Sequence, residues 1–151
     1  MTVIKHLMLT PQLMRKSSKA EARDTAMKYL ERVKIPELAD KYPSQLTRYQ
    51  EQRLTVARAL CMNPDIMLFD VMANISEMSD VMTDLARYGM TMIITNSQRH
   101  TEGLNVTEMR FACSLADNMV FMDNGEIVEI TPPAEFFDNP KSEQAKLFLE
   151  D

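Results

Sequence analysis

Residues 42–71 read YPSQLTRYQEQRLTVARALCMNPDIMLFDV, and this stretch decides how the rest of the chain is interpreted. Thr47 is followed three residues later by Gln50, which is a capping-box pattern. In a capping box each of the two side chains binds a backbone N–H of the other residue, so a helix is predicted to begin at Arg48. Pro64 limits this helix at its far end, because the residue before a proline is biased away from helical geometry.

A strand is predicted directly after this helix. Ile66–Phe69 is an apolar run of strand length, and Asp70 closes it with a carboxylate. Open α/β sheets place their ligands at the carboxyl ends of the strands. The helix and the strand therefore predict an α/β protein in which Asp70 lies at a functional edge.

Upstream of this stretch the sequence predicts helices. Ser18 and Glu21 form a second capping box, and apolar residues recur at helical spacing from there to Lys34. Residues 1–16 carry little pattern, and Pro11 is expected to interrupt any helix there.

Downstream, turn residues separate short periodic segments. The expected strands are 90–95, 118–122 and 126–129, and the expected helices are 76–88, 108–115, 132–137 and a last one capped by Ser142. Asn124-Gly125 favours a type I′ hairpin turn between the last two strands, because both residues tolerate positive φ.

Composition narrows the class of protein. The chain has 151 residues, a size typical of one domain, and 45% hydrophobic residues. Its net charge of −5 argues against a nucleic-acid partner. No stretch approaches the roughly 20 apolar residues that a membrane span needs, and the start of the chain lacks the apolar region of a secretory signal. Cys61 and Cys113 give no metal-ligand spacing, so we expect both to be packed in a reduced, cytoplasmic protein.

The order of short motifs resembles the ATP-binding subunits of ABC transporters, of the polar amino-acid importer type. The motifs that carry the resemblance are Gln50, Gln52-Arg53, Ala57-Arg58-Ala59-Leu60, Asn63-Pro64 and Leu68-Phe69-Asp70. It resumes downstream, as in Ala116-Asp117, Phe121-Met122-Asp123 and Pro132-Pro133-Ala134-Glu135-Phe136-Phe137. It covers nearly all of this chain and about the C-terminal three fifths of the family domain.

The resemblance implies an α/β fold, a partial P-loop NTPase-like core with three layers and a mainly parallel sheet, plus an N-terminal helical subdomain. We expect the helical, signature-bearing subdomain at 1–63 and the C-terminal half of the ATPase core at 64–151. In the family a phosphate-loop strand lies beside the strand that is 90–95 here. We expect 90–95 to close the gap by pairing with 118–122, and the alternative is that a second copy supplies the missing strand.

Several family positions have changed where ATP should be held. No Gly-x-x-x-x-Gly-Lys-Ser/Thr motif occurs, and the chain has only three glycines. The family signature Leu-Ser-Gly-Gly-Gln is replaced by Leu46-Thr47-Arg48-Tyr49-Gln50, so Thr47, Arg48 and Gln50 are the candidate nucleotide-binding residues. Arg48 and Tyr49 are expected to crowd the approach of a nucleotide, although Arg48 could still meet an anion.

The catalytic positions have also changed. Asp70 matches the magnesium-assisting aspartate of the family and is the candidate metal ligand, with a solvated or helix-capping acid as the alternative. Val71 occupies the position of the catalytic glutamate, and the switch histidine falls on Ser97 or Thr107, although His100 is nearby. Glu77 replaces the aspartate of the loop that connects paired nucleotide sites. No catalytic residue is therefore assigned.

Three functions fit these features. The first is a truncated or diverged ATP-binding-subunit-like protein that is unable to bind or hydrolyse ATP alone, with no cofactor expected and ATP with Mg²⁺ implied by resemblance only. The second is a non-catalytic module that docks a membrane permease through residues 1–62, or an ATPase partner, at the inner membrane. The third is an ordinary ATPase whose missing half is supplied elsewhere. A homodimer is the other partner considered, and no nucleic acid is expected.

Overall fold

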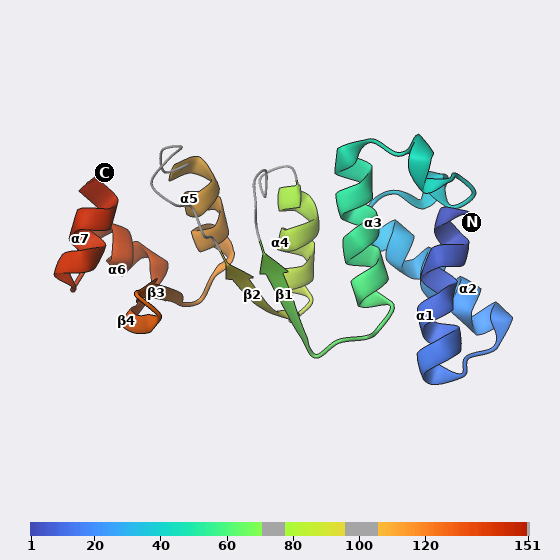
Figure 1. The fold of residues 1–151 in the computed structure, drawn as a ribbon, viewed down its shortest axis with the longest axis horizontal. Helices are drawn as coiled ribbons and strands as arrows, with labels where there is room; N and C mark the ends of the chain where they lie inside the picture. Colours follow the sequence, from blue (N-terminus) through green and yellow to red (C-terminus); the bar gives the residue numbers. More distant parts are fainter. Residues whose placement is uncertain (71–77, 96–105, 151) are drawn as a thin grey trace. The chain divides into compact units, whose positions relative to one another are not determined.

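The structure, a computed structural model, describes residues 1–70, 78–95 and 106–150 (Figure 1). Its elements in chain order are α1 Val3–Arg15, α2 Lys19–Arg32, η1 Pro36–Leu38, η2 Pro43–Gln45, α3 Arg48–Leu60, β1 Ile66–Asp70, α4 Ser79–Arg87, β2 Thr91–Thr95, α5 Val106–Leu115, β3 Met119–Asp123, β4 Glu126–Thr131, α6 Pro133–Asp138 and α7 Glu143–Glu150. They group into two compact units, one formed by Met1–Met67 with Arg87–Ile93 and the other by Leu68–Ala86 with Ile94–Asp151.

The first unit is built on α1, α2 and α3, which pack against one another (Figure 1). Their inward residues recur at three- and four-residue spacing, as a helix needs to present one apolar face. The buried residues of the three helices include Val3, Ile4, Leu7, Ala22, Ala26, Leu30, Val56, Ala57 and Leu60. The backbone N–H groups of Val3 and Ile4 donate to the carbonyl oxygens of Lys41 and Ala39 at 2.8 and 2.9 Å, which ties the start of α1 to the segment after α2.

Both predicted capping boxes are confirmed. Ser18 accepts from the backbone N–H of Glu21 at 3.3 Å, and the Glu21 carboxylate accepts from the N–H of Ser18 at 2.8 Å. Thr47 and Gln50 make the same reciprocal pair, at 3.3 and 3.0 Å. Four backbone donors at helix starts are thereby satisfied by local side chains.

The prediction that Pro11 interrupts any helix in residues 1–16 was wrong, because α1 continues through Pro11 to Arg15. Pro11 lacks a backbone N–H, which removes one hydrogen bond from the helix. Its ring is nevertheless buried on the same side as Val3, Ile4, Leu7 and Met8. Burial of this continuous apolar face stabilises the helix enough to offset the lost bond.

The strands form two separate two-stranded sheets. β1 and β2 pair in parallel, and β3 and β4 pair as an antiparallel hairpin. Asn124 and Gly125 have φ of 48° and 83°, which confirms the predicted turn with positive φ at both central residues.

The expected pairing of 90–95 with 118–122 was wrong, because β2 and β3 belong to different sheets. A two-residue turn lets β3 find β4 locally, whereas a β2–β3 pair needs a long crossover. The gap that we expected to close therefore stays open among the described strands.

The second unit places aromatic side chains behind the hairpin. Phe136 of α6 is fully buried, and its ring centroid lies 5.7 Å from that of Phe121 on β3. Phe148 of α7 approaches Phe121 from another element, with 5.2 Å between ring centroids. The inward face of β3–β4 is therefore covered by α6 and α7.

Candidate functional site

The carboxyl ends of β1 and β2 bring together Asp70 and Thr95. The Thr95 hydroxyl lies 3.0 Å from Asp70 Oδ1 and 3.3 Å from the carbonyl oxygen of Phe69. The Thr95 hydroxyl has only one proton to donate, and the Asp70 carboxylate is a stronger acceptor than the Phe69 carbonyl. Asp70 and Thr95 are both exposed, so the carboxylate is oriented by a neighbour and still faces solvent.

Thr95 was missed by the sequence analysis. The signal that could have found it is its position, because it ends the strand that is parallel to the one ended by Asp70. Polar residues at adjacent strand ends meet at one edge of a parallel sheet.

The N-terminus of α3 carries the other three candidates, Thr47, Arg48 and Gln50. Thr47 and Gln50 use their side chains for the capping box, which occupies the polar groups that a nucleotide would otherwise meet. Arg48 is exposed. The sequence candidates at this helix start therefore have a structural role in stabilising the helix, and only Arg48 presents its charge to solvent.

Tyr49 is held back against its own helix by Arg53. The Arg53 guanidinium donates to the Tyr49 hydroxyl and lies 4.4 Å from the centre of its ring. Arg53 itself is buried, and its Nη1 donates to the carbonyl oxygen of Val33 at 2.8 Å. This arginine fixes the first turns of α3 to the end of α2, a role that the sequence analysis did not assign.

The positions assigned to the lost catalytic groups lie outside what the structure describes. Val71, Glu77, Ser97 and His100 fall in the segments 71–77 and 96–105. Thr107 lies in α5, and its side chain is outside the described part of the structure. The statements about these positions remain predictions from the sequence.

The described residues do not form a complete magnesium–nucleotide site. Among them, no group of three or more His, Cys, Asp or Glu side chains is arranged to hold a metal ion. Asp70 could contribute one carboxylate oxygen, whereas Mg²⁺ takes six oxygen ligands, including phosphates where a nucleotide is bound.

A hollow of about 340 Å³ lies in the first unit, and it is lined by none of the predicted site residues. Its lining includes Lys28, Arg32 and Tyr88, and the Arg32 guanidinium lies 3.9 Å from the centre of the Tyr88 ring. Stacking on an aromatic face is a common arrangement for arginine at a protein surface, and here the stacked pair forms part of the wall of the hollow.

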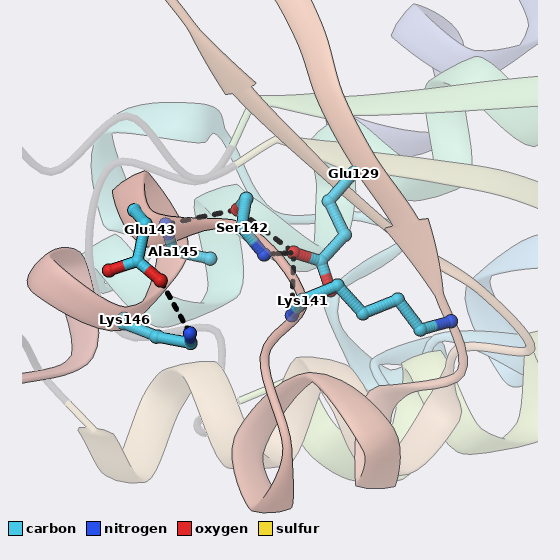
Figure 2. A network of polar contacts seen from close by, with 6 residues as sticks. All are labelled: Glu129, Lys141, Ser142, Glu143, Ala145 and Lys146. Atoms are coloured by element: carbon cyan, nitrogen blue, oxygen red, sulfur yellow. Dashed lines mark hydrogen bonds and ion pairs between the residues drawn. The ribbon is translucent and has the colours of Figure 1, made fainter.

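Glu129 is a buried acid with a structural role (Figure 2). Its carboxylate accepts from the backbone N–H groups of Lys141 and Ser142 at 3.0 to 3.2 Å, and from the Ser142 hydroxyl at 2.9 Å. The Ser142 hydroxyl in turn accepts from the N–H of Ala145 at 3.1 Å, which confirms Ser142 as the cap of α7. Burial raises the pKa of Glu129, but these donors together outweigh burial and the pKa is lowered overall.

The two cysteines are packed and unreactive. Burial raises the pKa of Cys61 to about 11 and raises the pKa of Cys113 as well. Both thiols are therefore protonated at neutral pH, and neither is activated as a nucleophile.

No helix in the described part of the chain has both the length and the apolar character needed to cross a bilayer.

Comparison with known proteins identifies close relatives of the sequence, although no family model matches it. The chain is 46% identical to the glutamine transport ATP-binding protein of Geobacillus stearothermophilus, over 99% of this chain and 60% of that protein. It is also 46% identical to a general L-amino acid transport ATP-binding protein of Rhizobium johnstonii, over 99% of this chain and 56% of that protein. The chain thus spans 56–60% of the length of these two relatives.

Solved structures show the same fold. A component of the cbiONQ ABC transporter complex of Clostridium perfringens superposes with a TM-score of 0.74 at 23% identity, over 91% of this chain and 53% of that one. An ATP-binding cassette of an ABC transporter, solved in its ADP conformation, gives a TM-score of 0.70 at 19% identity, over 97% of this chain and 63% of that one. These similarities confirm the predicted ABC ATPase fold class.

Proposed function

We propose that this chain, a homologue along 99% of its length of the ATP-binding proteins of amino-acid ABC transporters, does not bind or hydrolyse ATP by itself. The observation that carries the proposal is a contrast within one sequence. Identity to the relatives is 43–46% along the matched residues, yet Val71 stands where the resemblance places the catalytic glutamate, and Arg48-Tyr49 stands where it places the two glycines of the signature. These 151 residues keep the framework of such a subunit with different residues at positions that act on the nucleotide.

The changed positions have a direct chemical consequence. Phosphoryl transfer depends on backbone N–H groups and a lysine that hold the β- and γ-phosphates, and on a polar residue that orients the attacking water. Val71, at the position of the family glutamate, can neither accept a proton nor orient water. Asp70 alone cannot hold the phosphates. We therefore propose that Asp70 binds a metal ion only where other groups hold the phosphates of the nucleotide.

The experiment is titration calorimetry with ATP and Mg²⁺, with the Geobacillus relative as the positive control. We expect no specific heat for this chain at millimolar nucleotide and no hydrolysis above background. Val71→Glu should not restore turnover, because an oriented water is useless without a held phosphate. A magnesium-dependent site of 1:1 stoichiometry and micromolar affinity would show that the proposal is wrong.

A second candidate function, docking of a membrane permease through residues 1–62, is favoured by one surface. Leu9, Leu13 and Met14 of α1 are exposed although the helix buries its opposite side. Exposed apolar residues clustered on one helix are typical of interaction sites. In this proposal the helical subdomain 1–63 meets the permease on the cytoplasmic side of the inner membrane.

A pull-down against permease subunits of amino-acid transporters tests the docking function. Leu13→Lys should abolish capture, whereas Asp70→Asn should leave it unchanged because Asp70 lies outside the docking segment. Equal capture of the two variants, or no capture of the unmodified chain, would remove docking through α1.

A further inference from the structure

The hollow in the first unit has charged side chains of both signs on its wall. Lys28 and Arg32 of α2 line it together with Asp65, which precedes β1, and Tyr88, which follows α4. Its volume of about 340 Å³ is at the lower end of the range for ligand sites in proteins. The hollow is therefore large enough for a small metabolite.

The two cations of the wall lie on one face of α2. Lys28 and Arg32 are four residues apart, so their side chains are neighbours on the helix surface, and like charges at this spacing repel each other. Among the described residues, neither of them forms an ion pair with an acid. An anionic group bound between the two side chains would relieve this repulsion.

Arg32 also has a donor that the protein leaves unused. Its guanidinium carbon lies 3.9 Å from the centre of the Tyr88 ring, so the ring covers one face of the guanidinium. The Arg32 Nε is buried and has no hydrogen-bond partner within the described part of the chain. A buried donor without an acceptor costs free energy. A carboxylate that accepts from Nε–H and a neighbouring N–H supplies this acceptor, in the paired geometry that arginine favours.

Asp65 determines which second group a ligand needs. Its exposed carboxylate lines the same hollow, and it forms no ion pair with Lys28 or Arg32. The opposite charges of the wall therefore lie apart from each other. A simple anion would satisfy the two cations but would bring its negative charge toward Asp65. A molecule with both a carboxylate and an ammonium group complements both signs of charge.

Hydrogen bonds hold the segment after α3 that forms part of the wall. Arg15 Nη2 donates to the carbonyl oxygen of Met62 at 2.7 Å, and the Asn63 N–H donates to the carbonyl oxygen of Leu60 at 2.8 Å. A site that is fixed before binding loses less conformational freedom when the ligand arrives. Leu60 and Pro64 line the hollow as well and give it apolar surface.

We propose that the hollow binds a free α-amino acid with an apolar side chain. The carboxylate of the ligand binds to Lys28 and Arg32, and its ammonium group binds to Asp65. Its side chain lies against the apolar part of the wall. The hollow contains none of the residues assigned to the nucleotide or the metal, so this inference goes beyond the proposed function and does not depend on it.

The test is titration calorimetry of the full chain with leucine, without nucleotide or metal. Two analogues keep the carbon skeleton of the leucine side chain and each lack one charge: 4-methylpentanoate has no ammonium group, and 3-methylbutylamine has no carboxylate. We expect saturable binding of leucine with a Kd of about 1 mM or tighter. Each analogue should bind at least about tenfold more weakly, because each loses charge-assisted hydrogen bonds.

Two charge-matched variants on one helix connect binding to the hollow. Arg32→Gln should weaken leucine binding at least about tenfold, because it removes the cation and the buried Nε donor. Arg23→Gln removes the same charge from an exposed position of α2 that does not line the hollow, and should change binding less than about twofold. Circular dichroism of both variants verifies that the fold is retained.

A third variant tests the orientation of the ligand. Asp65→Asn removes the partner of the ammonium group, so it should weaken leucine binding and leave the binding of 4-methylpentanoate no weaker. The preference for leucine over 4-methylpentanoate should then fall from at least about tenfold to less than about twofold. A merely structural role of Asp65 would weaken both ligands equally and leave the preference unchanged.

Four results would overturn the proposal. They are no saturable binding of leucine to the unmodified chain, equal weakening by Arg32→Gln and Arg23→Gln, an unchanged preference in Asp65→Asn, and tighter binding of inorganic phosphate than of leucine. The last result would mean that the hollow is a site for simple anions. Because no nucleotide is present in the measurement, failure of this inference is distinguishable from failure of the proposed function.

Discussion

The helices of the first unit and the strands of the molecule treat their apolar residues in opposite ways. α1, α2 and α3 bury an apolar face against one another, so this unit contains its own core. The hairpin buries one face against α6 and α7 and leaves the other bare. The difference teaches that the helical unit buries its apolar residues within itself, whereas the hairpin leaves Val120, Met122, Ile127 and Ile130 exposed.

The largest expected effect tests the completeness of the helical unit. Leu30 is fully buried between the helices, so Leu30→Ala removes a packed side chain and leaves a cavity. We expect a loss of about 2–5 kcal/mol in the free energy of unfolding, measured by urea denaturation followed by circular dichroism. Leu13→Ala on the exposed side of α1 is the control and should change it by less than about 0.5 kcal/mol. Equal losses would mean that the helical core does not hold the unit together.

The second effect concerns pH and the inward side of the hairpin. The pKa of Glu129 is lowered in the folded state from its ordinary value of 4.5. Its contribution to stability is therefore fully present above pH 4.5 and is lost as the pH falls through the folded pKa. Glu129→Gln should lower the melting temperature at pH 7 and flatten the pH dependence below 4.5, as measured by thermal denaturation across pH 2–7. Unchanged acid sensitivity in the variant would contradict this role.

The third effect is smaller and returns to the helical unit. Thr47→Ala removes the side chain that accepts from the N–H of Gln50, and should cost about 1 kcal/mol of stability. Thr55→Ala, in the middle of the same helix, removes only a hydroxyl that donates back to the Glu51 carbonyl and should cost little. If both variants lose the same stability, the capping box does not set the start of α3.

The smallest expected effect concerns the exposed apolar face of the β3–β4 hairpin. In the chain alone, Ile127→Thr removes apolar surface that is already in water, so the free energy of unfolding should change by less than about 0.5 kcal/mol. The variant should also remain soluble to higher concentration, measured by light scattering. A large loss of stability would show that Ile127 is covered within this chain.

The sequence predicted best the features that depend on neighbours a few residues apart. The capping boxes at Ser18 and Thr47 and the turn at Asn124-Gly125 all arise from local backbone chemistry. Packing overrode local propensity at Pro11, because burial of an entire helix face outweighs one lost hydrogen bond. Likewise, the β2–β3 pairing depended on distant segments and was wrong.

The candidate site shows the same division. Asp70 was found because it ends an apolar run, but its neighbour Thr95 is 25 residues away in sequence and needed the sheet to be seen. The buried Arg53 and Glu129 were missed because their acceptor and donors lie on distant segments, at Val33 and at Lys141-Ser142. A charged residue looks solvated in a sequence until the group that pairs with it is known.

Cys61 and Cys113 allow the opening of each of the two units to be measured separately. Cys61 belongs to the helical unit and is almost completely buried, while Cys113 belongs to the other unit and is half-buried. A thiol-specific reagent can modify the buried thiol only when the structure around it opens, because burial excludes the reagent and keeps the thiol protonated. The labelling rates of the two thiols in the unmodified protein therefore measure how often the structure around each thiol opens. One rate reports opening of the helical unit, and the other reports opening of the unit that contains the hairpin.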